Sequence, residues 1–539
     1  MFLHGSPPFC EAGISSQSDS YTFTRRRCTL IVGNDEKITT VADSKHSSIL
    51  RNSQYLSVMS DGNKTYRCGL IWFRNDLRLS DHEALFRASE ACETVVCLYF
   101  IPVALQGMGY GGLPRFSRLR ARFLKESLTD LAGGLSELGA GLYVTDSGFS
   151  ETLEALFREH RVDALFFHDE PGDEEAREAE ICLSVASRFG IEVHQFFGAS
   201  LHHPDDVPFE IADTPDVFTS FRTNVEKTGN IRPPFPKPVY LKSPLQVRHD
   251  SFTLPSWLSE CAGKAETSEH TAFPFVGGEN AALKRLKSYF WETRGIERYK
   301  ETRNGLVGTE YSSKLSPWLA VGCISPRAVF AELLQYEQQR VRNESTYWLI
   351  FELRWRDFYM FQMLKHGKRS FNLHGPFNKA RSWGEDEKGL EAWKCGRTGV
   401  PFVDAGMREV TATGYMSNRS RQNCASFLSN NLNIDWRLGA QWFEAHLLDY
   451  DVSSNWGNWA YNSRVGCDPR DRFFDVVGQG ERYDRNAEYI SLWVPELKRL
   501  STEAMHRPWK NSVDAGRYPR PVVDLEASYT RLYRESRKS

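Results

Sequence analysis

Short apolar runs alternate with longer amphipathic stretches over residues 65–198. Five runs have the length and apolar character of buried strands, namely 69–73, 95–101, 141–145, 164–167 and 192–197. Stretches with a helical period fill 118–138 and 173–188 between them. Such alternation is typical of a parallel sheet with helices on both faces. The pattern therefore predicts a doubly wound parallel-sheet α/β domain over 65–198.

The pattern changes after this first region. Residues 199–275 are rich in proline, and the run 232–238 (RPPFPKP) excludes a regular helix there. We expect a linker between domains, laid over the first one. Beyond it, 276–510 carries the helical period almost throughout, as in 279–291, 326–340, 346–364 and 436–448. These residues predict a second, all-α domain.

The two ends of the chain lack long apolar periods. Residues 1–64 are rich in Ser and Thr and contain three consecutive arginines, but no apolar segment of a secretory signal. Acidic residues such as Glu11, Asp19 and Asp35 count against a transit peptide, so a transit peptide and a plain disordered leader stay equally open. The destination is then either a chloroplast or mitochondrion, or else the cytoplasm or nucleus. Residues 511–539 predict a short flexible tail with solvated basic side chains.

Composition narrows the class of protein. No apolar run approaches the ~18 residues of a membrane helix, so no membrane association is expected. A net charge of −2 neither supports nor excludes nucleic acid, because a local basic groove does not appear in that sum. Eleven cysteines without a C-x-x-C pair indicate free thiols, and we predict no metal site. We expect a monomer.

Tryptophan is concentrated in the second domain. Twelve of the fourteen tryptophans lie at or after Trp291, and 435–461 holds four of them beside Asp449, Asp451 and Asn455. A purely structural core prefers aliphatic side chains, and buried carboxylates are costly without a specific partner. This mixture therefore predicts a site for a planar redox ring rich in N–H and hydroxyl groups.

Residues 312–317 have the composition of a phosphate-binding loop. Ser316 is placed to cap a helix that begins with Pro317, and such a helix start can hold a phosphate. A similar start recurs at Ser325, so the cap alone decides nothing. The additional hydroxyls and Lys314 leave a phosphate site and an ordinary helix start equally open.

Two helical faces carry candidate polar side chains. Glu352, Trp355 and Arg356 share one face, which fits either a ligand contact or a simple i, i+4 ion pair between Glu352 and Arg356. Asn418 and Gln422, with Arg421, share another, which fits either a pocket wall or helix capping by Asn418.

Three glycines formally match a dinucleotide-binding fingerprint. Gly107, Gly109 and Gly112 would suggest a nicotinamide oxidoreductase. They follow the second strand rather than the first, and Leu113 and Pro114 intervene before any helix. We interpret them as loop glycines.

The chain resembles the photolyase and cryptochrome family, most closely its cryptochrome DASH branch. Five motifs fall in that family's order and spacing within residues 66–510: 299–304, 312–317, 355–359, 416–419 and 448–451. The resemblance implies FAD held in a bent shape inside the helical domain. Its implied binding residues are Tyr299, Ser312, Ser313, Lys314, Leu315, Ser316, Asn418, Arg421, Asp449, Asp451 and Asn455.

The resemblance also implies two sets of reactive residues. Trp459, Trp436 and Trp383 match an electron-transfer chain that runs from the surface to the flavin. The catalytic set, which would contact a flipped pyrimidine dimer in DNA, is Glu352, Trp355, Asn418, Gln422 and Tyr461. Gln422 and Tyr461 stand where classical photolyases have Met and Trp. Both departures are typical of the DASH branch, and they weaken the contact that extracts a base from a duplex.

Glu126 resembles the DASH carboxylate that binds a folate antenna. An ordinary exposed glutamate on a helix is an equally good interpretation. The resemblance implies 5,10-methenyltetrahydrofolate as the second cofactor.

The resemblance therefore predicts a blue-light flavoprotein that repairs cyclobutane pyrimidine dimers, preferentially in single-stranded DNA. Photoexcited reduced FAD would donate the electron. The alternative from another class is a blue-light signalling photoreceptor with little or no repair activity. Asn455, opposite flavin N5, and Glu352 favour repair, since an amide there favours the reduced forms of the ring without adding charge.

Overall fold

The computed structural model describes residues 65–245, 252–468, 470, 473–510 and 516–537. The predicted leader, 1–64, lies outside these residues. Within the described part of the chain, every helix is too short or too polar to cross a bilayer.

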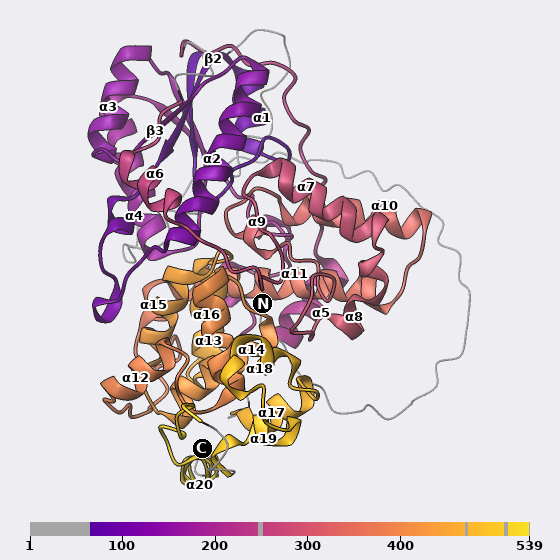
Figure 1. Cartoon of the computed structure of the whole chain (residues 1–539). Coiled ribbons are helices and arrows are strands. Elements are labelled where there is room, and N and C mark those ends of the chain that lie inside the picture. Colours follow the sequence, from indigo (N-terminus) through magenta and orange to yellow (C-terminus); the bar gives the residue numbers. More distant parts are fainter. Residues whose placement is uncertain (1–64, 246–251, 469, 471–472, 511–515, 538–539) are drawn as a thin grey trace, which may run out of the picture. The chain divides into compact units, whose positions relative to one another are not determined.

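A five-stranded parallel sheet forms the centre of the N-terminal domain (Figure 1). Its strands are β1 (Tyr66–Phe73), β2 (Cys92–Phe100), β3 (Leu142–Thr145), β4 (Ala164–His168) and β5 (Glu192–Phe196), in the order β3-β2-β1-β4-β5. Leu70 of β1 pairs with Val96 on one side and with Leu165 on the other. The strand order reverses at β1, which confirms the predicted doubly wound sheet.

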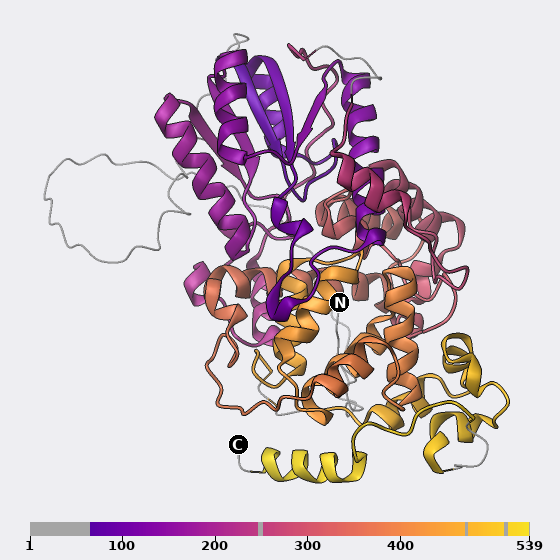
Figure 2. The ribbon, with the colours of Figure 1, turned by 60° about the vertical axis from the view of Figure 1, so that its left-hand side comes forward.

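Alternate side chains of β1 point to opposite faces of the sheet, as strand geometry requires. Ile71 and Phe73 pack on the face covered by α1 (Glu83–Ala91) and α2 (Arg118–Leu138). Leu70 and Trp72 pack on the face covered by α3 (Phe149–His160) and α4 (Asp173–Phe189). Figure 2 shows helices on both sides of the strands.

The connection between the domains contains two helices that its prolines had obscured. α5 (Phe218–Thr228) packs against the helical domain, and α6 (Ser256–Gly263) packs against α2. Both helices occupy stretches free of proline, and α5 buries Phe218, Phe221 and Val225. The segment therefore lies over both domains and not over the first alone.

The second domain is helical, as predicted. Its core contains α11 (Glu344–His366), which begins with a capping box and packs against α5, α8 and α16. The other helices are α7 (Glu279–Lys287), α8 (Tyr299–Thr302), α9 (Ser316–Ala320), α10 (Pro326–Gln339), α12 (Glu387–Lys394), α13 (Pro401–Thr413), α14 (Asn418–Ser426), α15 (Trp436–His446), α16 (Val452–Asn462), α17 (Val476–Tyr483), α18 (Glu488–Trp493), α19 (Thr502–His506) and α20 (Leu525–Ser536). A π-helical turn, η9 (Phe427–Asn431), continues α14.

The C-terminal residues differ from the flexible tail expected from sequence. α20 packs against η9, and Arg531 donates to the carbonyl oxygens of Asn430 and Asn431 at 2.6 and 3.2 Å. Asn431 donates to Ser528 at 3.0 Å, and Leu532 is fully buried. The polar composition of α20 obscured a helix that is held through two backbone carbonyl groups of a π turn.

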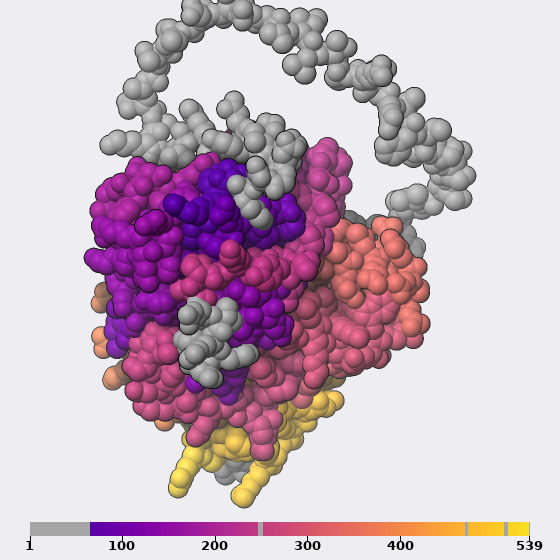
Figure 3. Space-filling model, turned by 90° about the horizontal axis from the view of Figure 1, so that it is seen from above, coloured from indigo at the N-terminus to yellow at the C-terminus, as the bar shows by residue number. Residues whose placement is uncertain are grey.

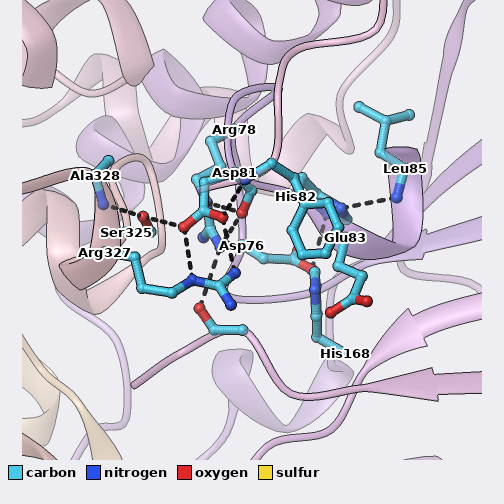
Figure 4. Close-up of polar contacts among 12 residues, drawn as sticks. Asp76, Arg78, Asp81, His82, Glu83, Leu85, His168, Ser325, Arg327 and Ala328 are labelled. Carbon is cyan, nitrogen blue, oxygen red and sulfur yellow. Dashed lines mark hydrogen bonds and ion pairs between the residues drawn. The ribbon is translucent and has the colours of Figure 1, made fainter. Parts of the chain in front are cut away.

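A buried carboxylate joins the two domains (Figure 4). Asp81, fully buried before α1, accepts from Arg327 at 2.8 and 3.0 Å and from the Ser325 hydroxyl at 2.5 Å. Ser325 in turn caps α10 by accepting from the Ala328 amide. Gly322 has a φ of +70°, and a Cβ there would lie 2.0 Å from the Asn75 carbonyl oxygen. Only glycine permits so close an approach of the two domains.

A second buried network lies beside this junction (Figure 4). Asp76 Oδ2 lies 3.0 Å from His82 Nε2 and 2.7 Å from His168 Nδ1. His82 Nδ1 accepts from the Leu85 amide, so the proton of a neutral His82 must sit on Nε2 and face Asp76. Burial opposes ionisation of Asp76, but the two imidazoles hold its pKa well below the usual value. The three groups have the spacing of metal ligands, but a metal would compete with the His82 proton.

Candidate functional site

A buried ion pair links α14 to the start of α16. Arg421 donates to both oxygens of Asp449 at 2.9 Å, and its Nε donates to the Met416 carbonyl. Burial alone would raise the pKa of Asp449, but Arg421 and the hydroxyl of Ser316 lower it. The structure thus pairs two of the residues that the resemblance implies for FAD binding.

Ser316 does not play the capping role predicted for it. Leu315 occupies the N-cap position of α9 and makes no side-chain cap, while the Ser316 hydroxyl donates to Asp449 at 2.7 Å. A buried carboxylate accepts this hydroxyl more strongly than a helix amide could donate to it. Ser316 and Asp449 therefore form one polar wall.

Asp451 and Asn455 lie one turn apart on α16. Asp451 caps the helix through the Ser454 amide and accepts from Arg356 at 3.1 Å. Asn455 is buried and donates to the Ala440 carbonyl at 3.0 Å. The Asn455 amide is thereby fixed in orientation.

Several buried polar atoms near these residues make no hydrogen bond within the described part of the chain. Asn418 Oδ1 is one, although the alternative interpretation made Asn418 a helix cap; Ser417 holds the N-cap position instead. Lys314 Nζ is another, 2.9 Å from the centroid of the Tyr311 ring, and burial holds the Lys314 pKa well below its usual value. Unpaired buried polar groups of both kinds fit a polar ligand with donors and acceptors.

The other residues of the predicted loop lie beside this wall. Ser313 and Leu315 are buried and Ser312 is half-buried, while Tyr299 on α8 is 8% exposed. The carbonyl oxygens of Ser312 and Ser313 accept from Arg285. This guanidinium fixes the loop from behind, and all the predicted FAD-binding residues belong to the helical domain.

Glu352 and Arg356 do not form the local ion pair that their spacing allows. Glu352 accepts from Arg303 at 2.6 Å and from the Trp348 indole at 3.0 Å. Arg356 instead contacts Asp451. Burial raises the pKa of Glu352 above its usual value, and the Arg303 cation offsets only part of that rise. Both side chains thus take partners from distant segments, which is the arrangement of a site and not of an exposed helix face.

Trp355 is enclosed by aromatic side chains. Phe218 of α5 stacks on it with ring centroids 3.7 Å apart and an interplanar angle of 13°. Tyr461 meets it edge-on at 6.3 Å. Trp355 and Glu352 are each 2% exposed, so a base can reach either one only after side chains move.

Gln422 lies on the same side of α14 as Asn418 but bonds to an arginine. Arg419 donates to Gln422 at 2.9 Å and to Asn304 at 2.9 Å, and its guanidinium lies 4.2 Å from the Tyr483 ring centroid. Burial lowers the Arg419 pKa to about 10. These partners carry no charge, so the Arg419 cation is poorly compensated by them.

The three tryptophans of the predicted electron chain share one apolar cluster. Trp459 and Trp436 are fully buried in it, and Trp383 packs against its edge. Gly384 pairs with Ile434 in an isolated parallel bridge, which brings the backbones next to Trp383 and Trp436 together. The set therefore runs from the interior toward the surface.

Gly439 makes room for the innermost ring of this set. A Cβ on Gly439 would lie 2.2 Å from the Trp459 ring. The glycine thus lets α15 and α16 approach around the indole.

Glu126 and the three loop glycines lie in the N-terminal domain. Glu126 accepts from the Gly277 amide at 2.8 Å and lies 3.6 Å from Arg122. A cavity of about 650 Å³ opens nearby between the domains, lined by Tyr99, Arg120, Phe123, Leu124, Asp451 and Trp456 among others.

Gly109 follows β2 and packs against Gln441 of α15, so the glycine run is a loop at the domain interface, as interpreted.

Sequence reasoning missed three side chains of the site. Arg303 lies within the 299–304 motif, so its charge was the available signal. Arg419 likewise lies within the 416–419 motif. Phe218 gave no signal, because its stacking on Trp355 depends on a contact between residues 137 positions apart.

Two family models match the chain. The family model described as the FAD binding domain of DNA photolyase matches residues 348–538. The model described as DNA photolyase matches residues 69–239. These two matches correspond to the helical and sheet domains.

Several known proteins are similar along most of their length. Cryptochrome DASH of Synechocystis is 42% identical over 470 residues, covering 85% of this chain and 96% of the relative. A crystal structure of a Synechocystis cryptochrome matches with a TM-score of 0.84 and 42% identity over 88% of this chain and 99% of that one. The Arabidopsis thaliana relative, "Cryptochrome DASH, chloroplastic/mitochondrial", is 40% identical over 81% of this chain and 77% of its own length.

Proposed function

The chain belongs to the photolyase/cryptochrome family, within its cryptochrome DASH branch, and from this premise we propose that it repairs cyclobutane pyrimidine dimers in DNA. The proposed substrate is dimer-containing single-stranded DNA. Reduced FAD, when bound and excited by blue light, supplies the electron that opens the dimer. The remaining steps fall to side chains of this chain.

The arrangement around Glu352 carries the proposal. A carboxyl with a raised pKa, held by Arg303 and the Trp348 indole, is poised to share a hydrogen bond with a base edge. Arg303 places a cation beside it at 9% exposure, and Arg419, at 2% exposure, donates to Asn304, the residue that follows Arg303. Cations in a dry site stabilise negative charge that develops on a bound base.

The FAD contacts are proposed in the same way. The orphaned Asn418 oxygen and Lys314 nitrogen, with Ser312, Ser313 and Tyr299, offer partners to phosphate and ribose groups. Asp451 and Asn455 offer a carboxylate and an amide to the ring. Asn455 is neutral and fixed by Ala440, so it adds no charge beside a reduced ring.

The preference for a single strand follows from the closed pocket. Trp355 and Glu352 must be uncovered before a base can enter, and this costs free energy in addition to base flipping. A base in a single strand needs less unstacking than one in a duplex. Contact of a base with Gln422 and Tyr461 offsets less of that free-energy cost than contact with larger apolar side chains would.

The test measures light-dependent repair of one dimer in an oligonucleotide, offered single-stranded and then as duplex, by reduced protein. Glu352→Gln removes the charge at constant size. Glu344→Gln, on the same helix and exposed, is the matched control. We expect repair of the single strand by the parent and by the control, and a loss of at least about tenfold in Glu352→Gln.

Three outcomes separate the alternatives. Equal repair of duplex would contradict the strand preference while leaving repair intact. Unchanged repair by Glu352→Gln would remove Glu352 from the catalytic set. A protein that binds and photoreduces FAD but repairs neither substrate would support the signalling photoreceptor.

We propose 5,10-methenyltetrahydrofolate as an antenna at Glu126. The Glu126 carboxylate already accepts from Gly277, so folate must compete with that bond or share the second oxygen. Absorbance of the purified protein near the folate band, compared between parent and Glu126→Gln, tests this. Retention of folate by Glu126→Gln would show that the antenna binds at another site.

We propose that residues 1–64 direct the protein to a chloroplast or mitochondrion. The Arabidopsis relative carries that location in its name. Fusion of residues 1–64 to a fluorescent protein, imaged in plant cells, tests the proposal. Diffuse cytoplasmic or nuclear fluorescence would contradict it.

A further inference from the structure

The outermost tryptophan of the predicted chain is stacked under a guanidinium. The guanidinium carbon (Cζ) of Arg381 lies 4.3 Å from the centroid of the Trp383 ring. Arg381 is held there by Asn430 Oδ1 at 3.0 Å and the Ser463 carbonyl at 2.6 Å, with a further bond to the Ser429 carbonyl. These fixed bonds prevent the cation from swinging away from the ring.

We infer that Arg381 tunes Trp383 as an electron donor by making its oxidised form less stable. The inference rests on the proposed function, in which Trp383 reduces oxidised Trp436. In that step one electron leaves the Trp383 ring and fills the hole on Trp436. Trp383 becomes a radical cation, Trp436 becomes neutral, and no proton moves.

The sign of the effect follows from the charges. A neutral indole attracts a guanidinium over its face, whereas an oxidised indole carries positive charge and repels it. The acidic residues that follow, Glu385, Asp386 and Glu387, are exposed, so solvent screens their opposing effect. Arg381 therefore shifts the hole back toward Trp436.

The indole nitrogen of Trp383 strengthens this argument. Trp383 Nε1 is buried and has no hydrogen-bond partner among the described residues. An oxidised indole loses its positive charge by releasing this proton or by regaining an electron, and no side chain of the described residues accepts the proton. The hole on Trp383 thus keeps its full charge next to Arg381, and the electron returns sooner.

The experiment follows the tryptophan radical by transient absorption in the FAD-loaded protein after a blue flash. Arg381→Gln keeps a hydrogen-bond donor and removes the charge, so the radical should decay roughly tenfold more slowly. Arg381→Lys keeps the charge and should decay nearly as the parent does. Lys388→Gln removes a nearby exposed charge and should change nothing.

A second pair of variants leaves the Arg381 bonds intact. Ser382 is exposed beside Trp383, and Ser382→Asp adds a compensating negative charge there. Its radical should outlive that of Ser382→Asn. Thermal unfolding of each variant is measured alongside. If Arg381→Gln folds poorly, the Ser382 pair still tests whether charge next to Trp383 sets the lifetime of its radical.

The outcomes distinguish the inference from its premise. Equal decay in Arg381→Gln and Arg381→Lys, with equal decay in the Ser382 pair, would overturn the inference while Trp383 remains a donor. Trp383→Phe should abolish the long-lived radical. Unchanged radical yield in Trp383→Phe would overturn both the donor role and the tuning role.

Discussion

Asp449 depends on one cation for its stability in the interior. It is 3% exposed at the side chain and receives both donors of Arg421. Removing one partner of such a pair leaves an uncompensated buried charge, which is more costly than losing both. Arg421→Met should lower the free energy of unfolding by about 3–5 kcal/mol.

Denaturant unfolding measures this, and Arg421→Met combined with Asp449→Asn is the control. The double variant should recover part of the loss, since no lone charge remains. A double variant as unstable as the sum of the two single ones would contradict the pairwise account.

The same pair predicts a pH dependence. The pKa of folded Asp449 is lowered, so its contribution to stability is present above the unfolded value of about 4 and is lost as pH falls through the folded value. The stability difference between the parent and Asp449→Asn should be constant near neutral pH and shrink in acid. Denaturant melts from pH 7 to pH 3 measure it. A difference that grows in acid would have the wrong sign.

Phe218 fixes the ring plane of Trp355 from outside the helical bundle. Phe218→Ala removes a buried ring and should cost about 3–5 kcal/mol in unfolding free energy. Phe218→Leu keeps most of the volume but loses the stack, so it should fold stably while Trp355 becomes mobile. Single-strand repair by Phe218→Leu should then fall mainly through KM. An unchanged KM would show that the stack does not position Trp355.

At the scale of elements, α20 stabilises a π turn. Arg531 donates to two carbonyl oxygens of η9, and Arg534, one turn later, is exposed. Arg531→Met should lower stability by about 1–3 kcal/mol, because hydrogen bonds to charged groups are worth more than neutral ones. Arg534→Met should change little.

Hydrogen exchange locates the effect of that change. In Arg531→Met the amides of residues 427–431 should exchange faster, while those of β1 should not. Faster exchange throughout the protein would indicate global destabilisation and contradict a local role for α20.

The sequence was most informative for elements with a local apolar pattern. β1 was predictable as a short continuous apolar run and α2 by its long helical period, whereas α11 buries every side chain from Glu352 to Met363. α5 was obscured by flanking prolines, and α20 by its charge. The site residues were found in sets by motif, but their partners were not. Glu352 and Arg356 pair with residues 49 and 95 positions away, and spacing along one helix carries no information about such contacts.

At the scale of the whole molecule, Asp81 joins the sheet domain to the helical domain, and one apolar cluster also contains buried residues of both. It lies before α1 of the sheet domain, and its donors Arg327 and Ser325 belong to the helical domain. Asp81→Asn should cost about 3–5 kcal/mol, since Arg327 would be left buried without its carboxylate. Asp205→Asn is the matched control, because Asp205 is 61% exposed at the side chain.

Two unfolding transitions in place of one would show that Asp81 couples the domains. Calorimetry of Asp81→Asn measures this, and limited proteolysis locates the newly accessible segment. A single transition shifted to lower temperature would indicate local destabilisation without uncoupling.

The near-complete burial of Trp355 has a kinetic consequence. If the chain must open before a base can enter, only the open fraction of molecules is competent to bind, and apparent affinity falls by that fraction. An open population of about one in a hundred would weaken binding about a hundredfold. The rate of DNA binding would then level off as DNA concentration rises. The limiting value would be the rate at which Phe218, Tyr461 and Glu352 move aside to open the pocket. The speed of this protein on damaged DNA would be set by its own side chains rather than by collision.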